Sequence, residues 1–283
     1  MDIDIPYLYA MLIRLSEQIS MTTIWMLVVA AIALVCEKIR PARKTTPFVH
    51  AETYIEIVFA YVMVLALWPM AKLIIDFFFL EAMQSSPLSR LSVPYIESWP
   101  VAVQVLICVF LMDLVNYATH RFMHAFGWPY HSVHHEAENV NWSTNWRVHP
   151  VDAMMSFVSL FVMDYIGFES KIIVYAAFVA NFCSSFSHFN VRLDWGFPFR
   201  YILMSPNFHH WHHAKKKEAV DMNFCVVFPL IDLLFGTFYC PKETPEKYGN
   251  FGKSTGPKLR HKLFQPFAEH AANLKRRWRK EDK

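Results

Sequence analysis

The chain contains four long apolar stretches, whose lengths constrain its fold more strongly than any other feature of the sequence. Residues 22–36 with a few neighbours are long enough for one membrane span, and residues 54–80 and 100–118 form two more. Residues 151–187 hold a fourth stretch, which is broken around Gly167–Lys171 and therefore predicts a helical hairpin. Because a span needs about 20 apolar residues, the pattern predicts an all-α, integral-membrane helix bundle. Each hairpin arm is short for a span, so full crossing and partial entry both stay open.

The composition agrees with a membrane protein. The 283 residues are 54% hydrophobic and only 18% charged, whereas soluble domains carry about a quarter charged residues. The five cysteines are an odd number without a CxxC motif, which favours small apolar fillers over a disulfide framework. With a formal net charge of only +3, we expect no nucleic-acid partner.

The basic residues predict the orientation of the bundle. The first span is followed by Lys38, Arg40, Arg43 and Lys44, and 17 of the 27 Lys and Arg residues come after His188. Residues 81–99, between the second and third spans, carry only Arg90. Because cytoplasmic loops are enriched in Lys and Arg, the chain enters the cytosol after the first and third spans. The hairpin then leaves and returns on the cytosolic side, so all the histidine-rich segments face the cytosol.

This pattern divides the chain into three parts. We expect an interfacial N-terminal segment at residues 1–20, a membrane domain at residues 21–240 and a basic cytosolic tail at residues 241–283. The tail ends in "NLKRRWRKEDK", which either contacts anionic lipid headgroups or is a solvated end. The sequence shows no removable signal and no retention signal, which favours a bacterial inner membrane over the endoplasmic reticulum.

Three histidine clusters carry the chemistry of the sequence: "HRFMH" at 120–124, "HSVHH" at 131–135 and "HHWHH" at 209–213. Side chains three and four residues apart on a helix project side by side. Each cluster can thus present two or three ring nitrogens to one point, and buried polar groups beside a membrane span are costly unless they are paired or bind a ligand. The candidate metal ligands are His120, His124, His131, His134, His135, His209, His212 and His213.

The number of histidines indicates two metal ions. Imidazole suits zinc, copper, iron and nickel, so the ligand type alone does not decide the metal. Eight histidines exceed the ligands of one tetrahedral zinc, however, and a redox pair beside an apolar bundle suggests oxygen chemistry on a lipid. Attack on an unactivated C–H bond needs a cofactor, because side chains alone cannot supply the oxidant.

The three clusters resemble those of the fatty acid hydroxylase superfamily, which includes sterol desaturases, sphingolipid hydroxylases and alkylglycerol monooxygenase. Further similar segments are "RVHP" at 147–150, "SHFNV" at 187–191, "MNF" at 222–224 and "DLLFGTFY" at 232–239, so the resemblance covers about residues 30–240. The resemblance implies two non-haem iron ions held by the eight cluster histidines at the cytosolic ends of a helix bundle. It further implies His188 as a ninth ligand, O2 as co-substrate, and electrons from a cytochrome or ferredoxin with its reductase.

Three other residues are candidates for supporting the metal site. His149 is either a further ligand or a residue that supports one. Asp113, in the third span, either orients a ligand imidazole through its free N–H or makes an interhelical hydrogen bond. Asn223 either supports a ligand or caps a turn, and the turn is favoured. His210 lies inside the third cluster at a position that the resemblance does not assign to a ligand.

The sequence therefore predicts a membrane-bound di-iron oxygenase that hydroxylates a C–H bond of an acyl, sterol or ether lipid. No catalytic side chain separate from the metal ligands is required. Desaturation of a sterol-like lipid with the same metal site is an alternative, because nothing in the clusters separates the two outcomes. A metal transporter would place its ionisable ligands near mid-membrane, which disfavours that alternative. An inactive lipid-binding scaffold should lack cluster histidines, and none of the eight is missing.

Overall fold

The computed structural model describes residues 5–67, 96–252 and 254–281, and within them the chain is helical. Its α-helices are α1 (Ile5–Ile39), α2 (Thr53–Val62), α5 (Val101–Ala125), α6 (Trp128–His135), α7 (Pro150–Ile166), α8 (Ser170–Ser187), α9 (Pro206–His212), α10 (Pro229–Leu234) and α11 (Leu259–Glu281). A π-helix, η1 (Met63–Leu67), extends α2, and single 3-10 turns are η3 (Ile96–Ser98), η4 (Thr144–Trp146), η5 (Phe199–Tyr201) and η6 (Lys217–Ala219). No strand occurs among these residues, and the predicted all-α class is confirmed.

Three of the helices are long and apolar enough to cross a membrane: Leu12–Ile39 in α1, Val101–Ala125 and Ser170–Ser187. They contain the first and third predicted spans and the second arm of the hairpin. The first arm, α7, has 17 residues and joins α8 through Gly167, whose φ of 100° is readily adopted only without a side chain. The helical hairpin is therefore confirmed. The first part of the predicted second span forms α2 and η1, and residues 68–95 lie outside the described residues.

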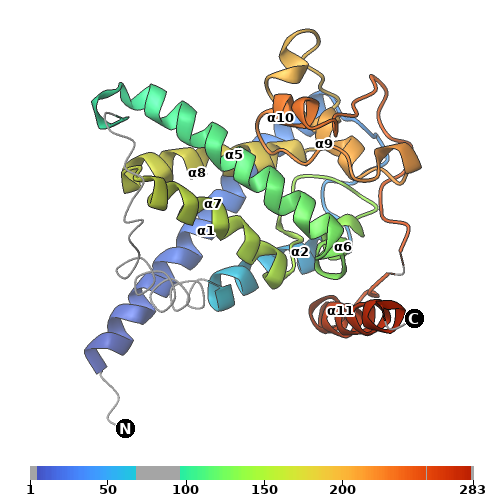
Figure 1. Cartoon of the computed structure of the whole chain (residues 1–283), viewed down its shortest axis with the longest axis horizontal. Helices are drawn as coiled ribbons and strands as arrows, with labels where there is room; N and C mark the ends of the chain where they lie inside the picture. Colours follow the sequence, from blue (N-terminus) through green and yellow to red (C-terminus); the bar gives the residue numbers. More distant parts are fainter. Residues whose placement is uncertain (1–4, 68–95, 253, 282–283) are drawn as a thin grey trace.

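Among the described residues, the predicted N-terminal segment is helical from Ile5 and the predicted C-terminal segment from Leu259. No break occurs at residue 20, because α1 runs continuously from Ile5 to Ile39. The C-terminal segment contains α11, which packs across α6 (Figure 1). Leu259 and Leu263 of α11 contact a small buried cluster formed by Ile55, Phe59 and Val133.

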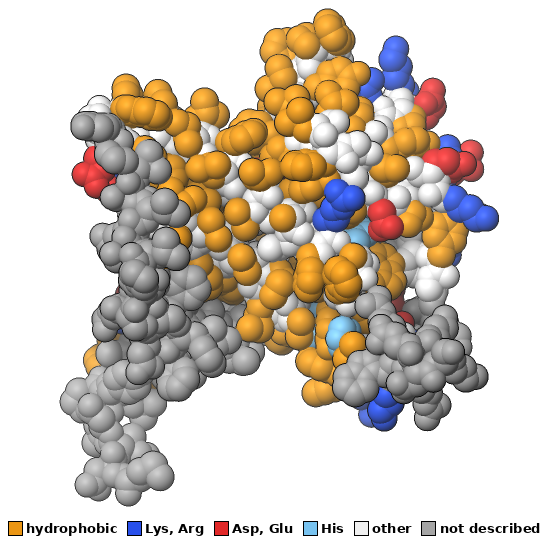
Figure 2. All heavy atoms as spheres, viewed as in Figure 1, with side chains coloured by type: hydrophobic (Ala, Val, Ile, Leu, Met, Phe, Trp, Pro, Cys, Tyr) orange, Lys and Arg blue, Asp and Glu red, His pale blue; other side chains and the backbone are white. Residues whose placement is uncertain are grey.

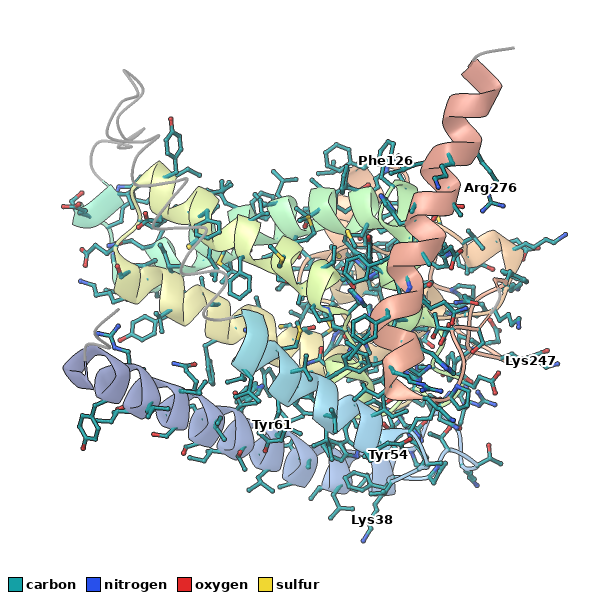
Figure 3. All side chains as sticks on the ribbon, turned by 90° about the horizontal axis from the view of Figure 1, so that it is seen from below. Lys38, Tyr54, Tyr61, Phe126, Lys247 and Arg276 are labelled. Atoms are coloured by element: carbon teal, nitrogen blue, oxygen red, sulfur yellow. The ribbon has the colours of Figure 1, made fainter. Side chains whose placement is uncertain are left out.

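The bundle core lies where α5 packs against α7 and α8. Its buried apolar side chains include Cys108 and Met112 from α5, Met163 from α7, and Ile172 and Ala176 from α8. Figure 3 shows α11 lying across α1 and α8 at the end that carries Lys38. The bundle therefore has one apolar body and one polar end.

The polar end is a cap of loops and short helices, and it is tied to the membrane helices by buried carboxylates. Glu37, near the end of α1, accepts hydrogen bonds from the backbone N–H groups of Trp142 (3.2 Å) and Asn190 (3.0 Å). In the space-filling view the body of the bundle is covered mostly by hydrophobic side chains, and charged side chains gather mainly over the cap (Figure 2). The apolar surface is the part that a membrane would cover.

Candidate metal centre

All nine histidines that the sequence singles out as ligands come together in two groups inside the cap. The five-histidine group contains His120, His124, His131, His135 and His212, and the four-histidine group contains His134, His188, His209 and His213. Within each group, one ring nitrogen of every residue lies within 4.8 Å of the others. The groups adjoin, because the His135 and His213 rings stack with centroids 4.7 Å apart. The geometry can therefore hold two neighbouring ions.

The helices α6 and α9 serve the two groups reciprocally. In α6, His131 and His135 are four residues apart and join the five-histidine group, while His134 turns to the other group. In the α9 segment, His209 and His213 form the corresponding pair of the four-histidine group, while His212 crosses over. The end of α5 completes the first group with two histidines, and His188, directly after α8, completes the second. Two HxxHH motifs thus build two sites, because the i+3 and i+4 side chains lie on opposite sides of the i side chain, about 100° apart around the helix, and can face different groups.

Backbone carbonyls orient four of the nine rings through their outer nitrogen. The Nδ1 atoms of His120 and His212 lie 2.8 and 2.7 Å from the carbonyl oxygens of Phe224 and Met222. In the four-histidine group, His134 Nδ1 lies 3.2 Å from Arg147 O, and His188 Nδ1 lies 2.7 Å from Ser184 O. A carbonyl can only accept, so each of these Nδ1 atoms carries the proton and each Nε2 atom carries a bare lone pair.

These lone pairs converge, and this convergence is what a metal ion would satisfy. His188 Nε2 lies 3.2 Å from His134 Nε2, although both rings hold their proton on the opposite nitrogen. In the five-histidine group, the buried Nε2 atoms of His124 and His212 have no hydrogen-bond partner. Two facing acceptors repel unless a cation lies between them, so the donor set fits transition-metal ions held by imidazole.

Two carboxylates that the sequence did not single out support the five-histidine group. Asp152, in the first turn of α7, places Oδ2 2.8 Å from His131 Nδ1. Asp221 places Oδ1 2.9 Å from His124 Nδ1, and its backbone has a left-handed φ of 58°. A carboxylate behind a ligand imidazole fixes its tautomer and raises its basicity. Only the position of Asp152, three residues after His149, hinted at this role.

Asp113 and Asn223 act on the loop that carries the orienting carbonyls. Asp113 accepts hydrogen bonds from the backbone N–H groups of Val226, Val227 and Phe228 at 2.7 to 2.9 Å. It thus holds the backbone just beyond Phe224 and does not contact a ligand ring. Asn223, with a φ of 62°, donates to the carbonyls of Phe208 and Tyr239 and fixes the turn between the two orienting carbonyls. Its amide group holds this segment and bonds to no ligand ring in the described structure.

His149 lies outside both groups. Its Nδ1 accepts a hydrogen bond from the N–H of Val151, which caps α7, and its Nε2 donates to the carbonyl of Leu263 in α11 at 3.0 Å. Both ring nitrogens are therefore used within the protein. His210 is also separate from the groups, and its Nδ1 lies 3.0 Å from the hydroxyl of Tyr248.

The surroundings keep the cap histidines neutral. Burial, followed by the neighbouring histidines, lowers the pKa well below 6.5 for His134, His135, His209, His212 and His213. Burial also lowers the pKa of His188 to about 4. A neutral imidazole is the form that binds a metal, so the rings are ready to bind at pH 7.

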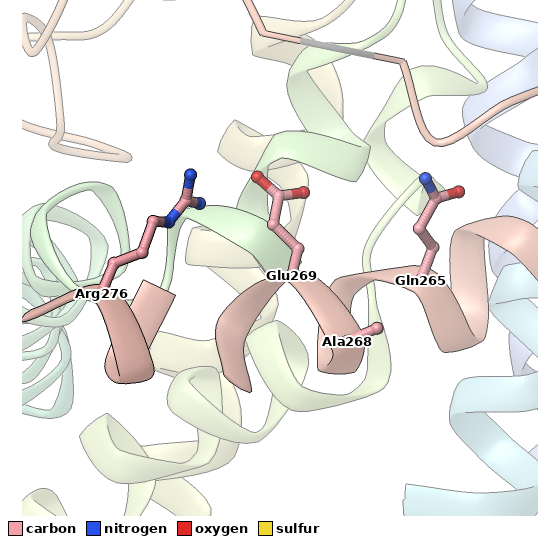
Figure 4. Close-up of a pocket in the computed structure, with 4 residues that line it drawn as sticks. All are labelled: Gln265, Ala268, Glu269 and Arg276. Atoms are coloured by element: carbon pink, nitrogen blue, oxygen red, sulfur yellow. The ribbon is translucent and has the colours of Figure 1, made fainter. Parts of the chain in front are cut away.

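Two shallow hollows on the surface of the described residues lie away from the histidines. One runs along α11 and is lined by Gln265, Ala268, Glu269 and Arg276, whose longer side chains extend to one side of the helix (Figure 4). The other lies by the hairpin turn, at residues 167–171. Neither touches a metal-ligand candidate, so the converging imidazoles identify the functional site more reliably than the surface shape.

Comparison with known proteins places these residues in a family. Residues 105–237 match the family model described as fatty acid hydroxylase, and this range encloses all nine histidines. The ornithine lipid hydroxylase OlsE of Rhizobium tropici is 27% identical over 176 residues, which are 61% of this chain and 53% of that protein. Alkylglycerol monooxygenases of Caenorhabditis elegans and Danio rerio are 29% and 30% identical over 50% and 49% of this chain.

The chain spans about half of the ornithine lipid hydroxylase and about 30% of the two alkylglycerol monooxygenases (28% and 31%). No solved structure matches it. The family match encloses the histidines and bears out the suspected superfamily: residues 105–237 match the fatty acid hydroxylase family model.

Proposed function

We propose that this protein is an integral-membrane oxygenase that hydroxylates a C–H bond of a membrane lipid, with two iron ions as cofactor and O2 as co-substrate. The observation that carries the proposal is the pair of adjoining histidine groups whose lone pairs converge at one end of an apolar bundle. Relatives named hydroxylase and monooxygenase support iron over zinc, because zinc has no redox chemistry. When bound, the iron pair would activate O2 and supply the oxidant that side chains lack.

The protein itself would bind the ions, orient the ligand rings and shield the site from water. The imidazole Nε2 atoms would hold the ions, and the carbonyls and carboxylates behind six of the rings would keep the proton of those rings on Nδ1. The Phe224 ring packs against His120, His124 and His212 with centroids 4.9 to 5.9 Å away and limits access of water to the five-histidine group. No side-chain nucleophile is needed.

The substrate would reach the histidines from the membrane side. The histidine-bearing ends of α5 and α8 continue directly from helices that are apolar enough to span a bilayer. A lipid chain lying along these helices would place a C–H bond beside the groups. The names of the relatives, ornithine lipid hydroxylase and alkylglycerol monooxygenase, favour an acyl or ether lipid over a sterol.

Electrons would come from a separate protein on the cytosolic side, a cytochrome or ferredoxin with its reductase. Lys215, Lys216 and Lys217 are exposed and begin two residues after His213, so a positive surface adjoins the four-histidine group. Such a surface favours an acidic donor. The same basic residues support a cytosolic orientation, and we retain the bacterial inner membrane as the proposed location.

The position of the histidines disfavours a transporter, because the ligands gather at one end of the bundle instead of along its middle. The presence of all nine ligand candidates disfavours an inactive scaffold. Desaturation remains an outcome of the test, since it would use the same groups.

The test is comparative lipid mass spectrometry of cells that express the chain, its His212→Ala variant or its His210→Asn variant. The first variant removes a ligand candidate, and the second changes a buried histidine of the same helix that lies outside both groups. A lipid one oxygen heavier in cells with the unchanged chain and with His210→Asn, but not with His212→Ala, is expected. A lipid two hydrogens lighter would reassign the protein as a desaturase. Purified protein with one metal ion per chain would contradict the two-iron proposal.

A further inference from the structure

The rest of the protein covers only part of the apolar surface of the C-terminal helix α11. Its inner side packs on the cap through Leu263, which joins a buried cluster, and Phe267 lies at the edge of this contact, with its ring 5.2 Å from the Tyr130 ring. Its outer side carries large apolar side chains with no comparable cover. Phe264 is 70% exposed, Phe267 49% and Leu274 46%.

The exposed apolar residues form a continuous stripe. Phe264, Phe267, Ala271 and Leu274 follow one another at intervals of three, four and three residues, which places them on one face of a helix. Gln265, Glu269 and Arg276 point to another side and line the polar hollow along the helix (Figure 4). The helix is therefore amphipathic on the side that the protein leaves open.

The placement of α11 matches the boundary between membrane and water. It lies across the direction of α1 and α8 at the cap end of the bundle (Figure 3), so its axis is roughly parallel to the plane of a membrane that contains those helices. Phe122 and Phe126, at the end of α5, are 51% and 54% exposed. Exposed aromatic residues at the end of a spanning helix are typical of a membrane interface. Tyr130, only four residues after Phe126, contacts α11. The stripe thus lies near the level at which the spanning helix α5 ends.

The charge of the segment agrees with that placement. Residues 258–283 contain nine Lys and Arg residues and three acidic residues, a net charge of 9 − 3 = +6. Among the described side chains, Arg260, Lys275 and Arg276 are exposed. A helix with an apolar face and a strongly basic polar face lies in the plane of anionic membranes.

We propose that α11 is an interfacial helix, which inserts the stripe of Phe264, Phe267, Ala271 and Leu274 among lipid chains and places its basic residues among anionic headgroups. The occupant of the open face is the bilayer that holds the bundle. The exposed aromatic end of α5, and the contact of the nearby Tyr130 with Phe267, argue for lipid over a second protein. The proposal is independent of the chemistry proposed for the histidines.

Spin labelling of the full-length protein in nanodiscs of phosphatidylcholine and phosphatidylglycerol tests this proposal. Phe264→Cys carries the label on the stripe, and Glu269→Cys carries it on the polar side of the same helix. Both are made in protein with Cys36→Ala and Cys240→Ala, because the other three cysteines are buried. Since both labelled positions are exposed, neither change should prevent folding.

The label at 264 should be several-fold more accessible to O2, relative to a water-soluble nickel complex, than the label at 269. Equal ratios at the two positions would overturn the proposal. Shielding of position 264 from both reagents would mean that protein, such as a second copy, covers the stripe, and would overturn it as well. Replacing phosphatidylglycerol by phosphatidylcholine should make position 264 more accessible to the nickel complex. An unchanged accessibility would overturn the role given to the basic residues.

Discussion

Six of the nine ligand candidates have a carbonyl or carboxylate oxygen behind the ring, and its contribution can be tested one residue at a time. The carboxylate of Asp152 contacts His131 Nδ1 and leaves Nε2 to face the other ligand candidates. We expect Asp152→Asn to weaken metal binding about 10- to 100-fold while the fold is kept, because the carboxamide still accepts the hydrogen bond but lacks the charge. Chelator competition on purified protein measures this affinity. Asp164→Asn, near the other end of α7, is the matched control, and equal affinities would contradict the prediction.

The depressed pKa of His188 predicts a loss of stability in acid. Because burial lowers this pKa to about 4, the unfolded chain binds a proton below pH 6.5 that the folded, metal-free chain does not. The loss begins below pH 6.5, is complete below about pH 4 and reaches about 3 kcal/mol for this residue. The unfolding temperature of metal-free protein in detergent should be constant above pH 7 and fall between pH 6.5 and 4. A flat profile down to pH 4 would refute the assignment.

At the residue scale, the sequence predicted which histidines meet but not what lies behind them. The spacing in "HSVHH" and "HHWHH" predicted shared helical faces, and His188 joined them through its resemblance to a family segment. The outer partners are mostly backbone carbonyls, whose positions depend on loop conformation and leave no side-chain signature. The sequence likewise showed no sign of the left-handed backbone at Asn223 or of the helix cap that His149 forms.

At the scale of elements, the C-terminal segment supports the helix that carries three ligand candidates. Glu136, directly after His135, accepts hydrogen bonds from the backbone and hydroxyl of Thr255, and its carboxylate lies 2.8 Å from Lys262 Nζ. Both charged side chains are buried, at 2% exposure for Lys262 and 5% for Glu136. This ion pair thus fixes the end of α6 to α11.

Breaking that ion pair should destabilise the cap. Lys262→Met leaves Glu136 as a buried carboxylate without its charged partner, which costs about 3–5 kcal/mol. Thermal unfolding in detergent should show a lower transition, accompanied by weaker metal retention. Lys275→Met, an exposed position of the same helix, should change neither quantity. A Lys262→Met protein as stable as this control would show that the ion pair contributes nothing to the stability of the cap.

The sequence predicted the helical hairpin better than it predicted the role of α11. Apolar length and Gly167 are local signals, and they located the two arms. The packing of α11 depends on contacts with residues far away in the chain, such as Tyr130 and Ile55, which no local pattern reveals. A disordered basic tail and a basic amphipathic helix can have the same composition, so composition alone does not distinguish them.

At the scale of the whole molecule, the structure separates an apolar body from a polar cap, and sidedness can be tested directly. Glu97 precedes α5 at one end of the bundle, whereas Lys216 belongs to the cap at the other end. A membrane-impermeant thiol reagent applied to intact cells should label Glu97→Cys, and it should label Lys216→Cys only after permeabilisation. The reverse pattern would place the histidines outside the cytosol.

The reciprocal use of α6 and α9 has a consequence for biogenesis. By residue 135 a growing chain has already produced four members of the five-histidine group, but only His134 of the other group. The remaining members emerge after the hairpin, with His188, His209 and His213. The first ion can therefore find a nearly complete set of ligands early in synthesis. The second site closes only after α8 has entered the membrane, so maturation of the pair should be ordered in time.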